Sequence, residues 1–251
     1  MDLALKGRIA LVTGGTSGIG RAIATALFDE GCEVHAADIN LSAVQNTPGF
    51  DARSVRPLCM DVGDASGVQR AVDAIVAERG RIDILVNCAG ILKIKPIVES
   101  TIADWDDVAR VNLSGVYYCC KAVLPTMIAQ RYGKIINIAS VSSVKGGGMF
   151  GNVLYGTTKA GVVAMTHGFA RELGPYGINV NAISPGNTAT PLNQHLQDDP
   201  EFVKLLESKT PTGRAYISTD EMAGAAIFLA SDDARAVHGL DLIVDDGWAA
   251  A

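Results

Sequence analysis

The sequence predicts one α/β domain with a doubly wound parallel sheet and helices on both of its faces. Short apolar, β-branched runs alternate with amphipathic segments along the chain, the pattern of strands joined by right-handed helical crossovers. A length of 251 residues is common for a single domain of this class. The hydrophobic content of 48% is enough to cover both faces of a sheet. We therefore expect a single domain over residues 1–251, built on a seven-stranded parallel sheet.

Seven runs have the length and the apolar composition of buried parallel strands. The predicted strands are 8–13, 33–38, 55–60, 82–87, 133–139, 178–183 and 240–244. Apolar residues at helical spacing predict helices at 18–30, 64–79, 104–130, 155–173 and 219–231, with a further helical segment at 191–209. Pro125 is expected to bend or interrupt the helix at 104–130. Ligands of such sheets bind beyond the carboxyl ends of the strands, so we expect the functional residues there.

The composition argues against several classes of protein. Five cysteines are an odd number without Cys-x-x-Cys spacing, and the four histidines are scattered, so neither a disulfide framework nor a metal site is expected. The net charge of −6 does not favour nucleic-acid binding. The chain has no run of about 18 apolar residues and no secretion signal at its start. We expect a cytoplasmic protein with no metal, no membrane and no nucleic-acid partner.

A glycine-rich turn directly follows the first predicted strand. Gly14, Gly18 and Gly20 stand between the strand at 8–13 and the body of the helix at 18–30. Strand, glycine turn and helix form the order that places a pyrophosphate on the free amide groups at a helix N-terminus. The spacing Gly-x-x-x-Gly-x-Gly differs from the commonest dinucleotide fingerprint, and a glycine-rich turn without a ligand is the alternative.

Tyr155 and Lys159 are the strongest candidates for chemistry. They are four residues apart in a predicted helix, so their side chains share one helix face. A phenol with its ordinary pKa of about 10 is a poor base at neutral pH, and a nearby ammonium favours the phenolate and lowers that pKa. The pair is therefore expected to supply general acid–base catalysis.

Several further motifs follow in a fixed order along the chain. They are Asp61-Val62 after the third strand, Asn87-Cys88-Ala89-Gly90 after the fourth, Asn112 in a helix, Ser140 at the end of the fifth strand and Pro185-Gly186 after the sixth. With these motifs the chain resembles the short-chain dehydrogenase/reductase family from about Leu5 to Trp248. The resemblance implies a Rossmann-like fold, a nicotinamide cofactor and hydride transfer to or from a secondary alcohol.

The resemblance also implies the residues of the site. The cofactor-binding residues would be Gly14, Ser17, Gly18, Ile19, Asp38, Asp61, Val62, Asn87, Ala89, Gly90, Tyr155, Lys159, Pro185, Gly186, Thr188 and Thr190. The catalytic residues would be Asn112, Ser140, Tyr155 and Lys159. Tyr155 would exchange the proton, Lys159 would lower the pKa of Tyr155 and hold the nicotinamide ribose, and a serine would hydrogen-bond the reacting oxygen. Asn112 would disturb its helix and fix a water that relays protons from Lys159. Cys88 replaces an asparagine of the family and is not expected to be reactive.

The catalytic serine can be assigned in two ways. The commonest family spacing, 13 residues before the tyrosine, selects Ser142, whereas alignment on the strand end selects Ser140. A strand end is more rigid than the glycine-rich loop Lys145–Gly151, which could hold two extra residues. Ser140 is therefore preferred, and Ser142 is left as a residue that could contact substrate.

Asp38 points to NAD as the cofactor. It ends the second predicted strand, where a carboxylate accepts hydrogen bonds from the adenosine ribose hydroxyls and repels a 2′-phosphate. The alternative is a loop aspartate that caps a helix starting near Asn40. Relatives selective for NADP usually carry Arg or Lys near this strand end or in the glycine turn, and this chain has neither there.

The substrate is predicted only as a class. Similarity to family members acting on polyols, sugar acids or small hydroxy acids favours an NAD-dependent alcohol dehydrogenase or ketone reductase. A 3-oxoacyl thioester reductase is the alternative enzyme, and a dinucleotide-binding sensor or scaffold is the non-enzymatic one. Enoyl reduction is less expected, because family members with that activity commonly space Tyr and Lys seven apart.

The remaining expectations concern a lid and the assembly. Residues 186–214 should form a substrate lid. The family usually has glycine at the position of Asp246, so the backbone of Asp246 would be strained if its φ is positive. The family pairs the helices at 104–130 and 155–173 across two-fold axes, so a homotetramer is expected. Apolar side chains could serve that interface or pack on the sheet: Val116, Val123, Met127, Val162, Val163 and Met165. Trp248 could be buried against a neighbouring subunit.

Overall fold

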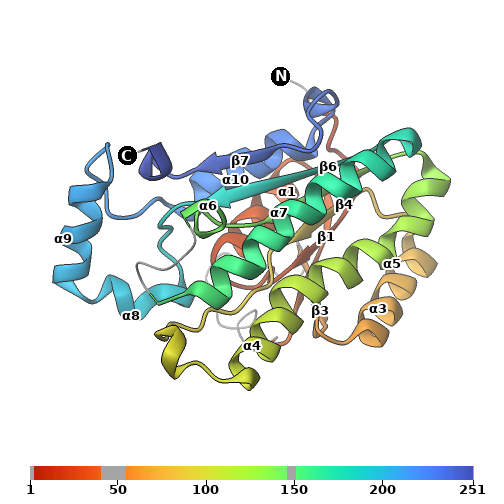
Figure 1. Ribbon diagram of the computed structural model, residues 1–251. Helices are drawn as coiled ribbons and strands as arrows, with labels where there is room; N and C mark the ends of the chain where they lie inside the picture. The colour runs from red at the N-terminus through yellow and green to blue at the C-terminus, as the bar shows by residue number, and fades with distance from the viewer. Residues whose placement is uncertain (1–2, 41–54, 146–150, 251) are drawn as a thin grey trace.

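The computed structural model describes residues 3–40, 55–145 and 151–250, and within them seven parallel strands form one sheet (Figure 1). The strands are β1 (Ile9–Thr13), β2 (Glu33–Asp38), β3 (Val55–Cys59), β4 (Ile84–Asn87), β5 (Gly133–Ile138), β6 (Ile178–Pro185) and β7 (Asp241–Val244). Their order is β3-β2-β1-β4-β5-β6-β7, so the direction of winding reverses between β1 and β4. Such a reversal opens a crevice at the carboxyl ends of the strands. The predicted fold class is confirmed.

Helices cover both faces of the sheet and bury two separate hydrophobic layers. On one face lie α1 (Gly18–Asp29) and α10 (Thr219–Ala230); on the other lie α3 (Ala65–Arg79), α5 (Gly115–Gln130) and α7 (Val153–Leu173). In β1, Ala10 and Val12 belong to the first layer, and Ile9 and Leu11 to the second. This alternation requires apolar side chains at every position of the strand, which is why the predicted strands read as continuous apolar runs. No helix in the described part of the chain is long and apolar enough to cross a membrane.

The predicted helix at 104–130 is divided, but not at Pro125. The segment consists of α4 (Ile102–Ala109), a π-helical turn η2 (Arg110–Ser114) and α5, which runs through Pro125 without a break. Asn112 lies inside the π-helical turn. Such turns insert one residue into a helix and are frequent at functional sites. The expected disturbance at Asn112 is therefore present. The helix is not interrupted at Pro125, and a bend there stays a prediction.

The predicted lid is a helical excursion beyond the sheet, at the left of Figure 1. It contains η5 (Pro191–Asn193), α8 (Gln194–Gln197) and α9 (Pro200–Lys209). Backbone hydrogen bonds from Ile217 N–H to Asn187 O (2.8 Å) and from Ala189 N–H to Ile217 O (3.1 Å) tie the two ends of the excursion together. The remaining short elements are η1 (Ile97–Glu99), α6 (Ser142–Lys145), η4 (Gly174–Tyr176), η6 (Asp232–Ala234) and η7 (Trp248–Ala250). None of these five was expected from the sequence.

The structure decides between the alternatives for the apolar side chains that were considered for an interface. Val116, Val123, Met127 and Val162 are buried in the layer between the helices and the sheet, so they are not available to another subunit. Val163 and Met165 are partly buried against the same layer. Trp248 is 8% exposed in the single chain, because it packs with Val141 and Leu206. No neighbouring subunit is needed to cover it.

Asp246 does adopt the strained conformation that its position suggested. Its φ is 55°, in the left-handed region. Arg214, at the end of the lid, donates to both of its carboxylate oxygens at 2.8 and 2.7 Å. The ion pair holds the C-terminal loop against the lid and offsets part of the backbone strain.

Candidate active site

The glycine turn after β1 forms a cradle that larger residues would fill. Gly14 has a φ of 63°, and a Cβ there would lie 2.9 Å from Ala89 Cα, on the turn after β4. A Cβ on Gly20 would overlap the carbonyl oxygen of Gly14. The helix α1 begins at Gly18, and Ser17 makes no side-chain hydrogen bond to its first amides. These amides and the close backbone approach fit the diphosphate of a dinucleotide.

The Asp38 carboxylate is held at the end of β2 on the wall of the same cleft. Thr16 Oγ1 donates to Asp38 Oδ2 at 2.6 Å, and the Asn40 N–H donates to Oδ1 at 3.2 Å. Thr16 in the glycine turn thus fixes the orientation of the carboxylate, a contact that sequence reasoning missed. The alternative of a helix starting near Asn40 falls on residues 41–54, outside the described residues.

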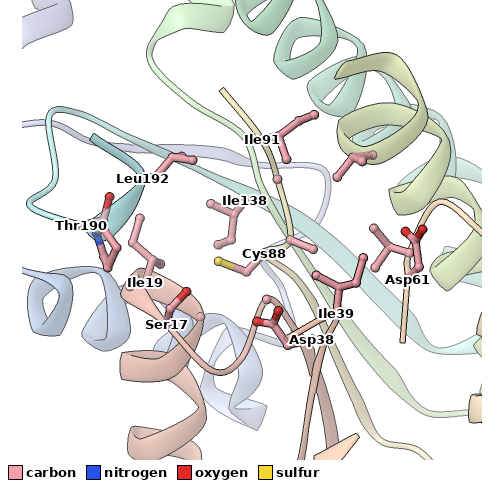
Figure 2. A pocket seen from close by; sticks show the side chains of 18 of the residues that line it. Ser17, Ile19, Asp38, Ile39, Asp61, Cys88, Ile91, Ile138, Thr190 and Leu192 are labelled. Atoms are coloured by element: carbon pink, nitrogen blue, oxygen red, sulfur yellow. The ribbon is translucent and has the colours of Figure 1, made fainter. Parts of the chain in front are cut away.

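A cleft of about 650 Å³ extends over the carboxyl ends of β1, β2 and β4. Figure 2 shows its side chains running from Asp61 at one end, past Asp38 and Cys88, to Ile19, Thr190 and Leu192 at the other. The expected cofactor residues on its wall are Gly14, Ser17, Gly18, Ile19, Asp38, Asp61, Val62, Ala89, Gly90, Tyr155, Lys159 and Thr190. Most of the implied cofactor site is therefore brought together.

Four expected cofactor residues lie elsewhere. Pro185, Gly186 and Thr188 line a second, adjoining cavity. Asn87 lines neither space: its amide donates to Cys120 Sγ at 3.3 Å and to Asn137 Oδ1 at 2.8 Å. The Asn87 side chain therefore turns into the helix layer and ties β4 to β5.

Arg110 is a cleft residue that the sequence did not reveal. Its guanidinium lies 3.0 Å from Asp61 Oδ2, and Asp61 Oδ1 also accepts from the Gly63 N–H at 2.8 Å. Arg110 opens the π-helical turn, and its approach to Asp61 depends on how that turn packs. No sequence spacing signals this contact.

Tyr155 stands at the junction of the cleft and the second cavity. The cavity has a volume of about 170 Å³, and Tyr155 and Ile138 line both spaces. Ser140 and Ser142 line only the cavity. The Ser140 hydroxyl lies on the same cavity wall as Tyr155, whose pKa it lowers, and it accepts from the Ser142 N–H at 3.1 Å. Residues 146–150 of the loop Lys145–Gly151, which was expected to hold two extra residues, lie outside the described residues.

The pKa of Tyr155 is raised in the structure, whereas the sequence predicted that Lys159 would lower it. Burial raises the pKa of Tyr155 to about 12, although the hydrogen bond with Ser140 lowers it. Burial also lowers the pKa of Lys159 to about 8. Lys159 Nζ lies 5.6 Å from the Tyr155 ring centroid and donates to the Ile138 carbonyl at 2.6 Å. In the protein alone, desolvation therefore outweighs the attraction between ammonium and phenolate.

Asn112 links the turn after β4 to the π-helical turn. Its Oδ1 accepts from the Ile91 N–H at 2.8 Å, and its Nδ2 donates to the Ile91 carbonyl at 2.9 Å. A Cβ on Gly90 would lie 3.3 Å from Asn112 Oδ1 and 3.7 Å from Lys159 Nζ, so both side chains flank Gly90. Asn112 thus lies beside the cleft wall without lining it.

Cys88 lines the cleft, and burial raises the pKa of its thiol to about 11. A thiol with a raised pKa is protonated at neutral pH and is a poor nucleophile. This agrees with the expectation that Cys88 is not reactive.

The second cavity contains residues that the sequence did not single out for substrate contact. Leu92 and Ile94 follow the turn after β4, and Trp248 comes from the C-terminal loop. Phe202, which also lines the cavity, belongs to the predicted lid. Asn152, three residues before Tyr155, also lines it. The i,i+3 spacing to Tyr155 could have identified Asn152, whereas no local signal brings Leu92, Ile94 and Trp248 together.

Comparisons with known proteins identify the family. A family model described as enoyl-(acyl carrier protein) reductase matches residues 14–249. The D-threitol dehydrogenase of Mycolicibacterium smegmatis is 41% identical over 250 residues, which cover 98% of this chain and 95% of that protein. The 3-oxoacyl-(acyl-carrier-protein) reductase of Thermotoga maritima is 38% identical over 247 residues, 97% of this chain and 98% of that protein.

Solved structures agree as well. A gluconate 5-dehydrogenase from Burkholderia cenocepacia, crystallised with NADP and tartrate, superposes with a TM-score of 0.91 at 38% identity and covers 99% of both chains. Fold, site and relatives together show that the chain belongs to the short-chain dehydrogenase/reductase family.

Proposed function

We propose that the protein is an NAD-dependent dehydrogenase that interconverts a secondary alcohol of the polyol, sugar-acid or small hydroxy-acid class and its ketone. The observation that carries this proposal is the position of Tyr155 between the cleft and the smaller cavity, on the cavity wall that also carries Ser140. The names of the relatives, a D-threitol dehydrogenase and a gluconate 5-dehydrogenase, support the substrate class.

Ser140 and Tyr155 have different roles in the proposed reaction. The Ser140 hydroxyl donates a hydrogen bond to the reacting oxygen of the substrate, and Tyr155 takes the hydroxyl proton during oxidation and returns it during reduction. A nicotinamide bound in the cleft supplies the hydride acceptor or donor. Positive charge entering the cleft would lower the pKa of Tyr155 from its raised value, which would let the phenolate form near neutral pH.

Lys159 and Asn112 complete the proposed machinery. Lys159, buried beside Tyr155, provides the cation that stabilises the phenolate and holds a ribose hydroxyl. Asn112 keeps the turn after β4 in place beside Lys159, where a water could relay protons to solvent.

Replacement of Tyr155 by phenylalanine tests the mechanism. Tyr155→Phe should bind NADH as the wild type does, by fluorescence titration, but lose nearly all turnover, because the ring remains and the exchangeable proton is gone. Near-normal turnover in Tyr155→Phe would overturn the assigned role.

We propose NAD rather than NADP because of Asp38. Its carboxylate faces the cleft with a fixed orientation and would repel a 2′-phosphate. Solved relatives contain NADP, so the preference has to be measured on this chain. The wild type should show a higher kcat/KM with NAD, and Asp38→Ser with Ile39→Arg should shift the preference toward NADP. A wild type that favours NADP would refute the assignment.

A 3-oxoacyl thioester reductase is the second candidate, favoured by the relative from Thermotoga maritima. The cavity volume of about 170 Å³ favours a small substrate, since sites for larger ligands usually measure ~300–1,000 Å³. Acetoacetyl-CoA with NADPH should therefore be a poorer substrate pair than a polyol with NAD. The reverse order would establish the thioester reductase instead.

We also propose a homotetramer, as the family resemblance implies. Tyr117 on α5 is 45% exposed and stacks on Phe169 of α7 with ring centroids 6.5 Å apart, which leaves aromatic surface on the outer face of these helices. Light scattering at micromolar concentration should give about four times the chain mass of 26.2 kDa. A monomer mass would contradict the proposal. The cytoplasmic location stays a prediction from the sequence.

A further inference from the structure

The C-terminal loop, residues 245–249, follows β7 and carries Trp248 (Figure 1). Its own hydrogen bonds make it compact: Asp245 Oδ1 accepts from the Gly247 N–H at 2.9 Å, and Oδ2 accepts from the Ala249 N–H at 2.6 Å. The Trp248 N–H donates to the Asp245 carbonyl at 3.1 Å. Because the loop is held together internally, a contact that fixes the loop in space also fixes Trp248.

The C-terminal loop lies between the two ends of the lid at 186–214. A Cβ on Gly186, where the lid begins, would lie 2.7 Å from Asp245 Cα. A Cβ on Gly247 would lie 3.0 Å from Pro211 Cγ, close to where the lid ends. The backbone of the loop therefore approaches both ends of the lid as closely as glycine allows.

An ion pair joins the C-terminal loop to the last residue of the lid. Arg214 Nε donates to Asp246 Oδ2 and Arg214 Nη2 donates to Oδ1, so the contact is bidentate. The Asp246 side chain is 15% exposed. Its backbone has a φ of 55°, which glycine adopts without cost. The backbone conformation gives no reason for aspartate at this position, whereas the ion pair does.

The lid and the C-terminal loop together form part of the wall of the 170 Å³ cavity. Leu196 and Phe202 line it from the lid, and Trp248 lines it from the loop. Trp248 also packs with Leu206 of α9 in a buried cluster. The width of the cavity therefore depends on how the loop sits against the lid.

We propose that the Arg214–Asp246 ion pair is a latch that holds the lid and Trp248 in the position that a small substrate needs. This inference rests on the proposed function, in which the cavity takes the alcohol. Without the latch the loop and the lid separate, the cavity widens, and the small substrate binds more weakly. Tyr155 and Lys159 lie on α7 and keep their places. Arg214 and Asp246 are thus positioning residues that act on the KM for the alcohol rather than on kcat.

The fluorescence of Trp248 tests the latch without turnover. The chain has two tryptophans, and Trp105 lies on α4 outside the cleft and the cavity, so Trp105→Phe leaves Trp248 as the sole emitter. In this background Asp246→Asn should shift the emission to longer wavelength and increase quenching by acrylamide, because Trp248 becomes exposed. Arg214→Lys keeps the charge but loses the bidentate geometry, so it should give a smaller shift than Arg214→Met.

Glu221→Gln is the matched control. Glu221 accepts from the same guanidinium, at 3.2 Å from Nη1 and 2.9 Å from Nη2 of Arg214. Glutamine removes this ion pair, keeps the capping box with Ser218 and leaves Asp246 intact. The emission of Trp248 and the KM for the alcohol should therefore match those of the wild type.

Asp246→Gly separates the latch from the stability of the fold. Glycine relieves the strain at a φ of 55°, so urea denaturation should show a stability equal to or above that of the wild type. The KM for threitol with NAD should nevertheless rise by about 3- to 10-fold, the effect of one ion pair with good geometry. The kcat and the affinity for NADH should stay nearly unchanged. A merely structural role would instead lower stability and kcat together.

The outcomes separate this inference from the proposed function. Unshifted emission in Asp246→Asn and Asp246→Gly would overturn the latch, and so would an equal shift in Glu221→Gln. Shifted emission with an unchanged KM would overturn the positioning role. A wild type that oxidises no polyol, sugar acid or hydroxy acid would overturn the proposed function, and the emission of Trp248 would still decide whether the latch exists.

Discussion

Replacing Gly14 by alanine should be far more costly than the same change at another glycine with similar backbone angles. Gly14 has a φ of 63°, and Gly80, which ends α3, has a φ of 73°. An L-residue in this left-handed region costs about 1–2 kcal/mol. That cost applies to Gly14→Ala and Gly80→Ala alike.

The surroundings of the two positions differ. A Cβ on Gly14 would lie 2.9 Å from both Ala89 Cα and Ala89 N, whereas a Cβ on Gly80 would meet nothing within 4 Å. Carbon atoms pack at about 3.5–4.0 Å, so the turns after β1 and β4 would have to separate by roughly 0.6 Å or more. Overpacking of this kind costs about 1–3 kcal/mol. Gly14→Ala should therefore lose ~2–5 kcal/mol of the free energy of unfolding, against ~1–2 kcal/mol for Gly80→Ala.

Urea denaturation of the two variants measures the difference, and NADH titration adds a functional readout. Gly14→Ala should weaken NADH binding, because the turn that approaches the diphosphate is displaced, and Gly80→Ala should bind NADH as the wild type does. We attribute the glycine at position 14 to the close approach of the turns after β1 and β4. Equal losses of stability in the two variants would refute this explanation, and so would an unchanged NADH affinity in Gly14→Ala.

Two further predictions concern the catalytic group. Ser140→Ala should lower kcat by ~10²-fold or more, the usual effect of losing a donor to a developing oxyanion. Ser142→Ala should lower kcat far less. If steady-state kinetics show the reverse order, the catalytic serine is Ser142. The pKa of Lys159 is lowered in the folded protein to about 8, so the unfolded chain holds more protons between that pH and about 10.5, and stability should rise with pH across this window. Lys159→Met removes this dependence, so the variant should be more stable than the wild type at pH 7, by at most ~3 kcal/mol. In denaturant titrations the difference in the free energy of unfolding should shrink as the pH approaches 10. A difference that does not change with pH would contradict the lowered pKa of Lys159.

The sequence by itself determined the sheet, its covering helices and the centre of the site. Strands buried on both faces must be apolar at successive positions, so their runs are readable without any tertiary contact. The glycine turn after β1 and the Tyr155–Lys159 pair can also be identified from the sequence alone. Each involves residues close together in the chain, and an i,i+4 spacing places two side chains on one face of a helix. Motifs at strand ends converge because parallel strands end at one edge of the sheet, which is why most of the implied cofactor residues line one cleft.

The tertiary structure decided what depends on neighbours distant in the chain. Arg110 reaches Asp61, and Trp248 is covered by Val141 and Leu206, through contacts that no local pattern encodes. The pKa of Tyr155 follows the same rule: spacing brings a cation near, but burial decides the direction of the shift. Sequence patterns predict the local backbone conformation. The burial of a side chain and its hydrogen-bond partners depend on how distant segments pack, so only the tertiary structure determines them.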